Sequence, residues 1–211
     1  MNPVTPRPIV RLRPPSLRDV RPLAAVRRLV AFRDLLLTLS LHRLKVRYAQ
    51  SRLGIAWAVL QPLAIMLAFT LVFLLLGADT AQGVPYPVFA YAALVPWTAF
   101  ASGLSNATTS LTGHAALLGK VAFPREILPL TYVVAACTDA ALACLPLAAL
   151  MAYYGVGVSP VGAWAIVALL LLAGLLAGAG LLLSAVQVRY RDVGLAMPVV
   201  LQVWMFATPV V

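Results

Sequence analysis

The chain has 211 residues, of which 63% are hydrophobic and only 10% charged, and its mean hydropathy is +0.96. Soluble domains carry about 25% charged residues, so this composition excludes an ordinary soluble domain and predicts helices that face lipid. Residues 1–52 hold twelve of the sixteen Lys and Arg but only two of the six acids. A nucleic-acid partner would explain this basic excess, but retention of Lys and Arg on the cytoplasmic side of a membrane explains it better. We therefore expect no nucleic-acid partner.

Residues 1–28 are predicted to form a cytoplasmic tail, because closely spaced prolines among the arginines break any helix. In residues 29–52 leucines and aromatic residues recur at spacings of three and four, which predicts a helix with a broad apolar face and basic residues opposite. A helix of this kind lies in the membrane interface; the alternative is an ordinary soluble helix packed on a partner. The residues assigned to this interface helix are Arg33, Arg43, Lys45, Arg47 and Tyr48.

Five apolar segments follow, each close to or above the about 20 residues that a helix needs to cross a bilayer. They are residues 53–77, 87–112, 127–154, 163–188 and 194–211. Lys and Arg occur where the second segment joins the third and the fourth joins the fifth, and are absent from the other two connections. The positive-inside rule therefore places the N-terminus in the cytoplasm. An odd number of spans ending at the membrane predicts that a C-terminal part is missing.

The closest approach to a nucleotide-binding loop is the stretch from Gly113 to Val121. It has five residues between its glycines instead of four, and Val121 stands where a P-loop needs Ser or Thr. We expect no ATPase site and no cofactor in this chain, so that ATP and Mg²⁺ would belong to a partner subunit. The few acids and His114 beyond residue 52 show no spacing typical of catalysis or metal binding, so no catalytic residue and no metal ligand are predicted.

The connection over residues 113–126 is cytoplasmic in this topology and contains a short, mildly amphipathic stretch. It is either a plain turn, in which Lys120 and Arg125 only fix the topology, or a separate helix that docks on a motor protein. The residues alone favour neither interpretation.

Asp139 is the one carboxylate deep inside a predicted span. An ionised carboxylate there costs at least about 2.5 kcal/mol, so it should face the bundle interior or a wet pathway, bonded to a hydroxyl or to Asn106. A structural or cavity-lining role is favoured over a proton relay. Tyr91 and Trp97 are either membrane-interface aromatics or sugar-stacking residues. The small-residue face of Gly174 and Gly178, flanked by Ala173, Ala177 and Gly180, predicts a close helix contact.

Several stretches resemble the permease subunit of ABC type 2 exporters, the branch that moves O-antigen, capsular polysaccharide and teichoic acid. They occur in family order and at family spacing from about residue 30 to the end. The stretches are LKVRYAQ (44–50), LGIAWAVLQP (53–62), YAALVPW (91–97), KVAFPREILPL (120–130), VRYRDV (188–193) and FATP (206–209).

The resemblance implies homodimers of six-span subunits, each bound to a cytoplasmic ATPase. It implies that segment 113–126 is a coupling loop, with contacts from His114, Leu117, Leu118, Gly119, Lys120 and Arg125. A polymer on a polyprenyl lipid would pass between the two permeases, and candidate lining residues are Tyr91, Trp97, Asn106 and Asp139. The family continues beyond Thr208-Pro209 with a re-entrant hairpin and a sixth span, so transport by the chain as it stands is not expected.

The sequence thus predicts an all-α polytopic protein of the bacterial cytoplasmic (inner) membrane. Its expected function is that of the permease subunit in an ATP-driven exporter of polysaccharide or lipid-linked glycan. Three alternatives stay open: the same fold with a drug or simple lipid as cargo, an integral membrane enzyme acting on lipid-linked sugars, and a passive scaffold. The sequence does not decide which glycan or lipid carrier is moved.

Overall fold

The computed structural model describes residues 29–49, 54–75, 80–81, 83–120, 123–157 and 162–208. The chain divides into two compact units, residues 1–33 and residues 34–211. The predicted cytoplasmic tail, residues 1–28, lies outside the described residues. The described part of the first unit is helical at residues 29–31. The rest of the fold belongs to the second unit.

The second unit is a bundle of helices, which confirms the predicted fold class. Its helices are α2 (Arg33–Ala49, beginning one residue before the unit), η2 (Gly54–Ala56), α3 (Trp57–Leu75), α4 (Tyr86–Gly113), α5 (Ala115–Lys120), α6 (Ile127–Tyr153), α7 (Ala163–Arg189) and α8 (Asp192–Ala207). A small antiparallel ribbon of β1 (Thr80–Ala81) and β2 (Val84–Pro85) joins α3 to α4. Gly83 turns this ribbon with a φ of 80°, a conformation that glycine adopts without strain.

Within the described residues three helices are long and apolar enough to cross a membrane: Tyr86–Gly113, Ile127–Tyr153 and Trp164–Arg189. They correspond to the second, third and fourth predicted spans. The apolar helices at the first and fifth predicted spans are shorter, Val59–Leu75 and Asp192–Ala207. Crossing by these two helices stays a prediction. Prolines lie inside α3, α4, α6 and α8, as membrane helices tolerate.

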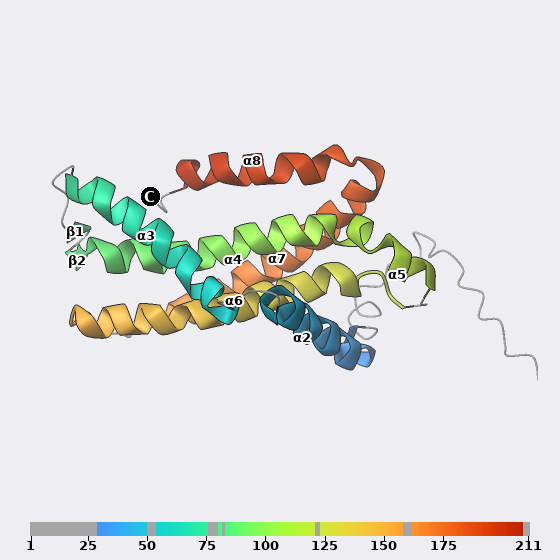
Figure 1. The fold of residues 1–211 in the computed structure, drawn as a ribbon, viewed down its shortest axis with the longest axis horizontal. Coiled ribbons are helices and arrows are strands. Elements are labelled where there is room, and N and C mark those ends of the chain that lie inside the picture. The colour runs from blue at the N-terminus through green and yellow to red at the C-terminus, as the bar shows by residue number, and fades with distance from the viewer. Residues whose placement is uncertain are drawn as a thin grey trace, which may run out of the picture. The chain divides into compact units, whose positions relative to one another are not determined.

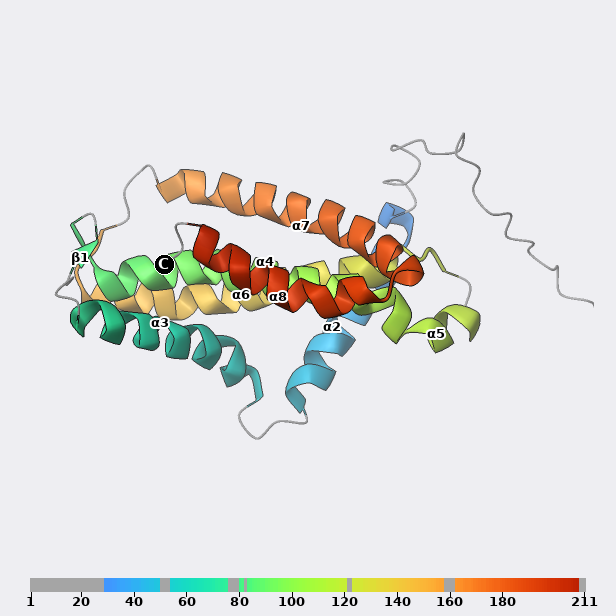
Figure 2. The same cartoon turned by 90° about the horizontal axis from the view of Figure 1, so that it is seen from above.

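Helix α4 is at the centre of the packing and contacts α3, α6, α7 and α8. Figure 1 shows α4 and α6 running alongside each other, and Figure 2 shows α3 and α7 on opposite sides of them. Two clusters of buried side chains hold the bundle together. The first joins α3, α4 and α6 around Tyr91 and Leu94, and the second joins α4, α6, α7 and α8 around Leu104 and Leu176.

The predicted small-residue face of α7 makes a close helix contact at Gly180, but not at Gly174 or Gly178. A Cβ added at Gly174 or Gly178 would meet nothing within 4 Å. At Gly103 it would lie 2.7 Å from a methyl of Leu176, and at Gly180 it would lie 3.0 Å from the Cβ of Ala107. The tight contact in this subunit is therefore between α4 and α7 at Gly103 and Gly180, while Gly174 and Gly178 face open space. Within the subunit the predicted packing face is therefore confirmed at Gly180 and wrong at Gly174 and Gly178.

Candidate functional site

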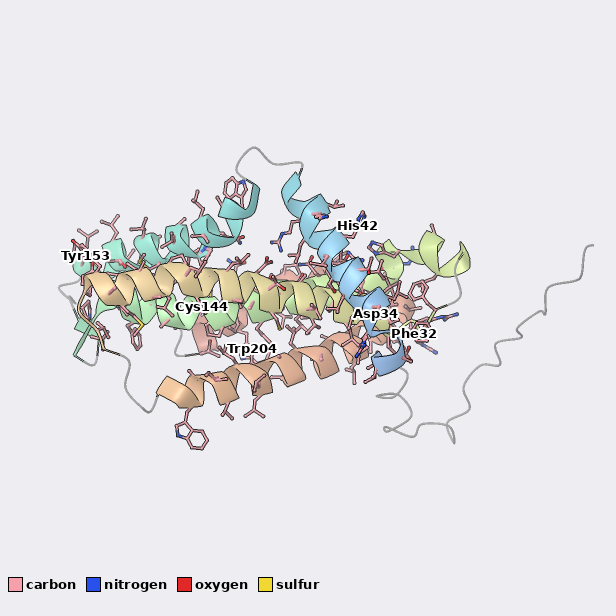
Figure 3. The ribbon with its side chains drawn as sticks, turned by 90° about the horizontal axis from the view of Figure 1, so that it is seen from below. Phe32, Asp34, His42, Cys144, Tyr153 and Trp204 are labelled. Carbon is pink, nitrogen blue, oxygen red and sulfur yellow. The ribbon has the colours of Figure 1, made fainter. Side chains whose placement is uncertain are left out.

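Helix α2 presents Ser40 and Arg43 to the bundle beside half-buried leucines, and two further leucines face outward. Figure 3 shows α2 lying across α6. Ser40 is buried and donates its hydroxyl hydrogen to the carbonyl of Leu36 at 2.7 Å, whereas Leu37 and Leu41 are exposed. The predicted amphipathic pattern is present, and residues of its polar side meet protein. Location of α2 in the membrane interface stays a prediction.

Arg43 connects α2 to the residue that follows α4 and to the start of α6, the two helices on either side of α5. Its Nε donates to Oγ1 of Thr131 at 3.1 Å, and its Nη2 lies 3.1 Å from Nε2 of His114. Its Cζ lies 3.7 Å from the ring centroid of Tyr132, a cation–π contact. His114 follows the last residue of α4, while Thr131 and Tyr132 are in the second turn of α6. One guanidinium therefore bridges the helices that flank residues 115–126.

The partners of Arg43 are themselves held in place. Thr131 is fully buried and donates its hydroxyl hydrogen to the carbonyl of Leu128 at 2.7 Å, which leaves its oxygen free to accept from Arg43. The Nδ1 of His114 lies 3.0 Å from the carbonyl of Ser110. With the proton on Nδ1, this ring donates to Ser110 and accepts from Arg43 through Nε2. Both contacts are then satisfied by one neutral tautomer.

Asp139, at the middle of α6, pairs with Arg47 of α2. The Nη1 of Arg47 lies 2.7 Å from Oδ2 of Asp139, and their side chains are 50% and 14% exposed. The amide of Asn106 instead donates to the carbonyl of Ser102 in its own helix, at 2.7 Å. The prediction that Asp139 needs a partner is confirmed, but Asn106 is not that partner. Arg47 was assigned to the interface helix and not to Asp139, because it lies outside the predicted spans.

A cavity of about 760 Å³ beside these contacts is lined by residues of α2, α4 and α6 and by His114. Its volume is within the range of small-molecule sites, about 300–1,000 Å³. Its walls combine four basic or imidazole side chains with Asn106, Tyr132 and apolar groups. The lining residues are Leu39, His42, Arg43, Leu44, Val46, Arg47, Asn106, His114, Leu128, Tyr132 and Ala135.

The coupling segment contains a helix of its own, α5, so the plain-turn interpretation is wrong. Figure 1 shows α5 at the same end of the bundle as the turn between α7 and α8. A second cavity, of about 700 Å³, lies between this segment and that turn and is lined in part by Leu118, Arg125, Gln187 and Arg191. Docking of α5 on a motor protein stays a prediction.

The turn between α7 and α8 is closed by the side-chain amide of Gln187, which is buried. Its Nε2 donates to the carbonyl of Arg191 at 3.0 Å, and its Oε1 accepts the backbone N–H of Gly194 at 2.6 Å. One amide therefore satisfies a donor and an acceptor at the junction of two helices. Gln187 was not predicted, and the signal for it in the sequence is an amide within an apolar run, two residues before Arg189.

The structure separates the predicted lining residues of α4. Trp97 lies in an aromatic group with Phe100 and Trp204. The ring centroids of Phe100 and Trp204 are 5.7 Å apart and those of Trp97 and Trp204 are 6.4 Å apart, both in edge-on geometry. These three residues line a cavity of about 230 Å³ between α4, α7 and α8. Tyr91 is instead 0% exposed, in the core formed with α3 and α6. Trp97 thus borders a cavity, and Tyr91 is part of the packing.

The remaining predicted site residues are more peripheral or outside the description. Arg33, Lys45 and Arg125 are exposed. The side chains of Tyr48, Leu117 and Lys120 lie outside the described part of the structure, and Gly119 is described only as a residue of α5. Within the described part of the chain, no group of three or more His, Cys, Asp or Glu side chains is placed to hold a metal ion.

Residues 34–211 match the model of the ABC-2 type transporter family. The chain belongs to that family. The match begins at α2 and includes the coupling segment and all the apolar helices. Membership confirms the resemblance found in the motifs of the sequence and identifies the chain as a membrane-embedded transport subunit.

Curated relatives of this ABC-2 chain are similar over most or about half of its length. The O-antigen export system permease protein RfbA of Myxococcus xanthus is 34% identical over 188 residues, which is 88% of this chain and 70% of that protein. Two proteins of the same name from Klebsiella pneumoniae are 37% and 34% identical over 100 residues. These two alignments cover 47% of this chain and 38% of each relative.

In this ABC-2 subunit the structure brings the interface-helix and coupling residues together. Arg43 and His114 were predicted in separate roles, and they meet at 3.1 Å. Arg47 and Asp139 were likewise assigned to different sites, and they form an ion pair. Thr131 and Tyr132 were not predicted, because a hydroxyl and a ring near the start of an apolar helix give no signal in sequence that α2 covers them.

Proposed function

We propose that the chain is the permease subunit of an ATP-driven exporter whose cargo is a lipid-linked polysaccharide of the O-antigen type. The observation that carries this proposal is the 34% identity to the Myxococcus O-antigen export permease across 88% of the chain. Family membership supports transport by the subunit, and the names of the relatives support the class of cargo.

The energy for export comes, in this proposal, from a separate cytoplasmic ATPase that binds ATP and Mg²⁺ and docks on α5. Two features support this partner. The nucleotide-loop pattern fails at Val121, and α5 is a separate helix at the junction of α4 and α6. Closure of the ATPase would push α5, and the two long helices that flank it would carry the movement through the bundle.

The route for the polymer is the seam between two copies of the subunit. Trp97 and Trp204 are partly exposed on the α4–α8 side of the bundle and border a cavity. Aromatic faces are suited to stacking against sugar rings, and the polyprenyl chain would stay in the lipid. We place the N-terminus in the cytoplasm and the protein in the bacterial inner membrane, because residues 1–52 hold twelve of the sixteen Lys and Arg.

Coupling is tested by removing bulk or charge from α5. Each of Leu117→Ala, Leu118→Ala and Lys120→Ala is expected to lower export by about tenfold or more, while ATP hydrolysis by the complex and membrane insertion persist. The assay is transfer of a radiolabelled polyprenyl-linked glycan across proteoliposomes that contain the permease and its ATPase. The matched control is Leu171→Ala, since Leu171 is exposed on α7.

Normal export by all three α5 variants would contradict the coupling role of this helix. Transfer of a simple phospholipid with no transfer of the glycan would contradict the proposed cargo while leaving the transport role intact. Glycan turnover without any ATPase present would indicate an enzyme instead of a permease.

A further inference from the structure

Arg43 keeps hydrogen-bonding capacity that its known contacts do not use. A guanidinium has five N–H donors. Nε is occupied by Thr131 and Nη2 by His114, and among the described residues Nη1 has no hydrogen-bond partner. None of the groups that touch Arg43 is a carboxylate, since they are a hydroxyl, an imidazole and the ring of Tyr132. Its positive charge is therefore not neutralised by an acid in the described chain.

The free side of Arg43 borders the 760 Å³ cavity between α2 and the bundle. Arg47 is four residues further along α2 and therefore lies on the same face of the helix. His42 and His114 also line the cavity. Asp139 forms its ion pair with Arg47, not with Arg43. The guanidinium of Arg43 is half-buried beside this cavity and has no carboxylate partner among the described residues, which favours binding of an anion in the cavity.

We propose that this cavity binds the phosphate of an anionic membrane lipid, with Arg43 as the residue that contacts the phosphate. A guanidinium matches phosphate oxygens with two parallel N–H donors, which Nη1 and the edge of Nη2 supply. The rest of the lining is mostly apolar and accepts the glycerol or the first carbons of a lipid tail, through Leu39, Leu44, Val46, Leu128 and Ala135.

The surroundings of the cavity favour a lipid over a soluble phosphate compound. Leu37 and Leu41 of α2 are exposed on the outward side of the same helix. An amphipathic helix with exposed leucines and basic residues is typical of the region where headgroups meet acyl chains. The lipid phosphate has two sources, a resident phospholipid such as phosphatidylglycerol or the polyprenyl diphosphate of a lipid-linked glycan, and the experiment distinguishes them.

The test measures binding to the full chain, without ATP or an ATPase, so that its result does not depend on the proposed export function. The chain is placed in phosphatidylcholine nanodiscs, and bound lipids are counted by native mass spectrometry while phosphatidylglycerol or undecaprenyl diphosphate is titrated. Arg43→Gln should weaken binding of the preferred lipid by about fivefold or more. The control Arg189→Gln removes an equal charge at an exposed site remote from this cavity and should leave binding unchanged.

A second variant tests the cavity without altering charge. Val46→Trp fills the cavity from the α2 side and should also reduce binding, while Arg43→Lys should restore part of what Arg43→Gln loses. A higher affinity for the diphosphate would assign the site to the cargo lipid, and a higher affinity for phosphatidylglycerol would assign it to a resident lipid. Wild-type lipid affinity in both Arg43→Gln and Val46→Trp, or displacement of the lipid by inorganic phosphate at equal concentration, would overturn the proposal.

Discussion

Single side chains of this subunit join helices that are distant in sequence. Arg43 and Arg47 of α2 reach α4 and α6 through hydrogen bonds and an ion pair that cross 71 to 92 positions of the chain. A cavity lies beside these contacts, while Ser40 of the same helix is buried. The position of α2 therefore depends on these polar contacts together with local packing.

The Arg47–Asp139 pair should appear as a coupling in a double-mutant cycle. Arg47→Ala is expected to destabilise the protein, and most of that effect should disappear in the Asp139→Ala background. Because Arg47 is 50% exposed, the coupling free energy should be modest, about 0.5–1 kcal/mol. Thermal unfolding in detergent measures it, and equal effects of Arg47→Ala in both backgrounds would show that the pair contributes nothing.

Gly194 is predicted to be intolerant of a side chain. An added Cβ would lie 2.7 Å from Nε2 of Gln187 and 2.9 Å from Cγ2 of Thr109. Gly194→Ala must therefore displace the amide that closes the turn between α7 and α8, at a cost of about 1–3 kcal/mol. Gly178→Ala is the matched control, because its Cβ would meet nothing within 4 Å. Equal unfolding temperatures for the two variants would contradict this argument.

At the scale of elements, α4 and α7 approach each other closely at Gly103 and Gly180. Hydrophobic burial contributes little between helices in lipid, so close packing and dispersion contacts hold this pair together. Leu176 is 2% exposed and packs against Gly103 of α4, whereas its neighbour Leu175 is 57% exposed. The sequence shows two adjacent leucines, and only the helix contact distinguishes them.

Leu176→Ala should destabilise the subunit by about 2 kcal/mol or more, since the lost side chain leaves a cavity against Gly103. Leu175→Ala removes the same atoms from an exposed position and should change stability by about 0.5 kcal/mol at most. Unfolding of both variants in the same detergent provides the measurement. A larger effect at Leu175 would indicate that this face of α7 is covered by a second copy of the subunit.

At the scale of the whole molecule, the proposed topology assigns the two ends of the bundle to opposite sides of the membrane. The assignment is tested with single cysteines at Ala115 and Gly157, both exposed. Cys137 and Cys144 are first replaced by Ala, because both are free thiols. A membrane-impermeant maleimide should label Ala115→Cys only from the cytoplasm and Gly157→Cys only from outside. Labelling of both positions from one side would exclude the topology.

The sequence by itself determined the fold class and the family. Apolar runs of about 20 residues predict membrane-spanning helices, because a helix satisfies its own backbone hydrogen bonds in lipid. The asymmetry of Lys and Arg predicts the orientation of these helices. It also marked Arg43, Arg47, His114 and Asp139, because charged or polar groups stand out in a chain that is only 10% charged. Local composition carries all of this information.

Tertiary structure decided which of these groups meet. It brought Arg43 of α2 to His114 and Thr131 and paired Arg47 with Asp139. It also buried Tyr91 while leaving Trp97 beside a cavity. Of the predicted small-residue face, it placed Gly180 at a close contact with α4 and left Gly174 and Gly178 open. The physical reason is that the rotation of each helix about its axis depends on contacts with its neighbours, and a uniformly apolar helix carries no periodicity that fixes this rotation.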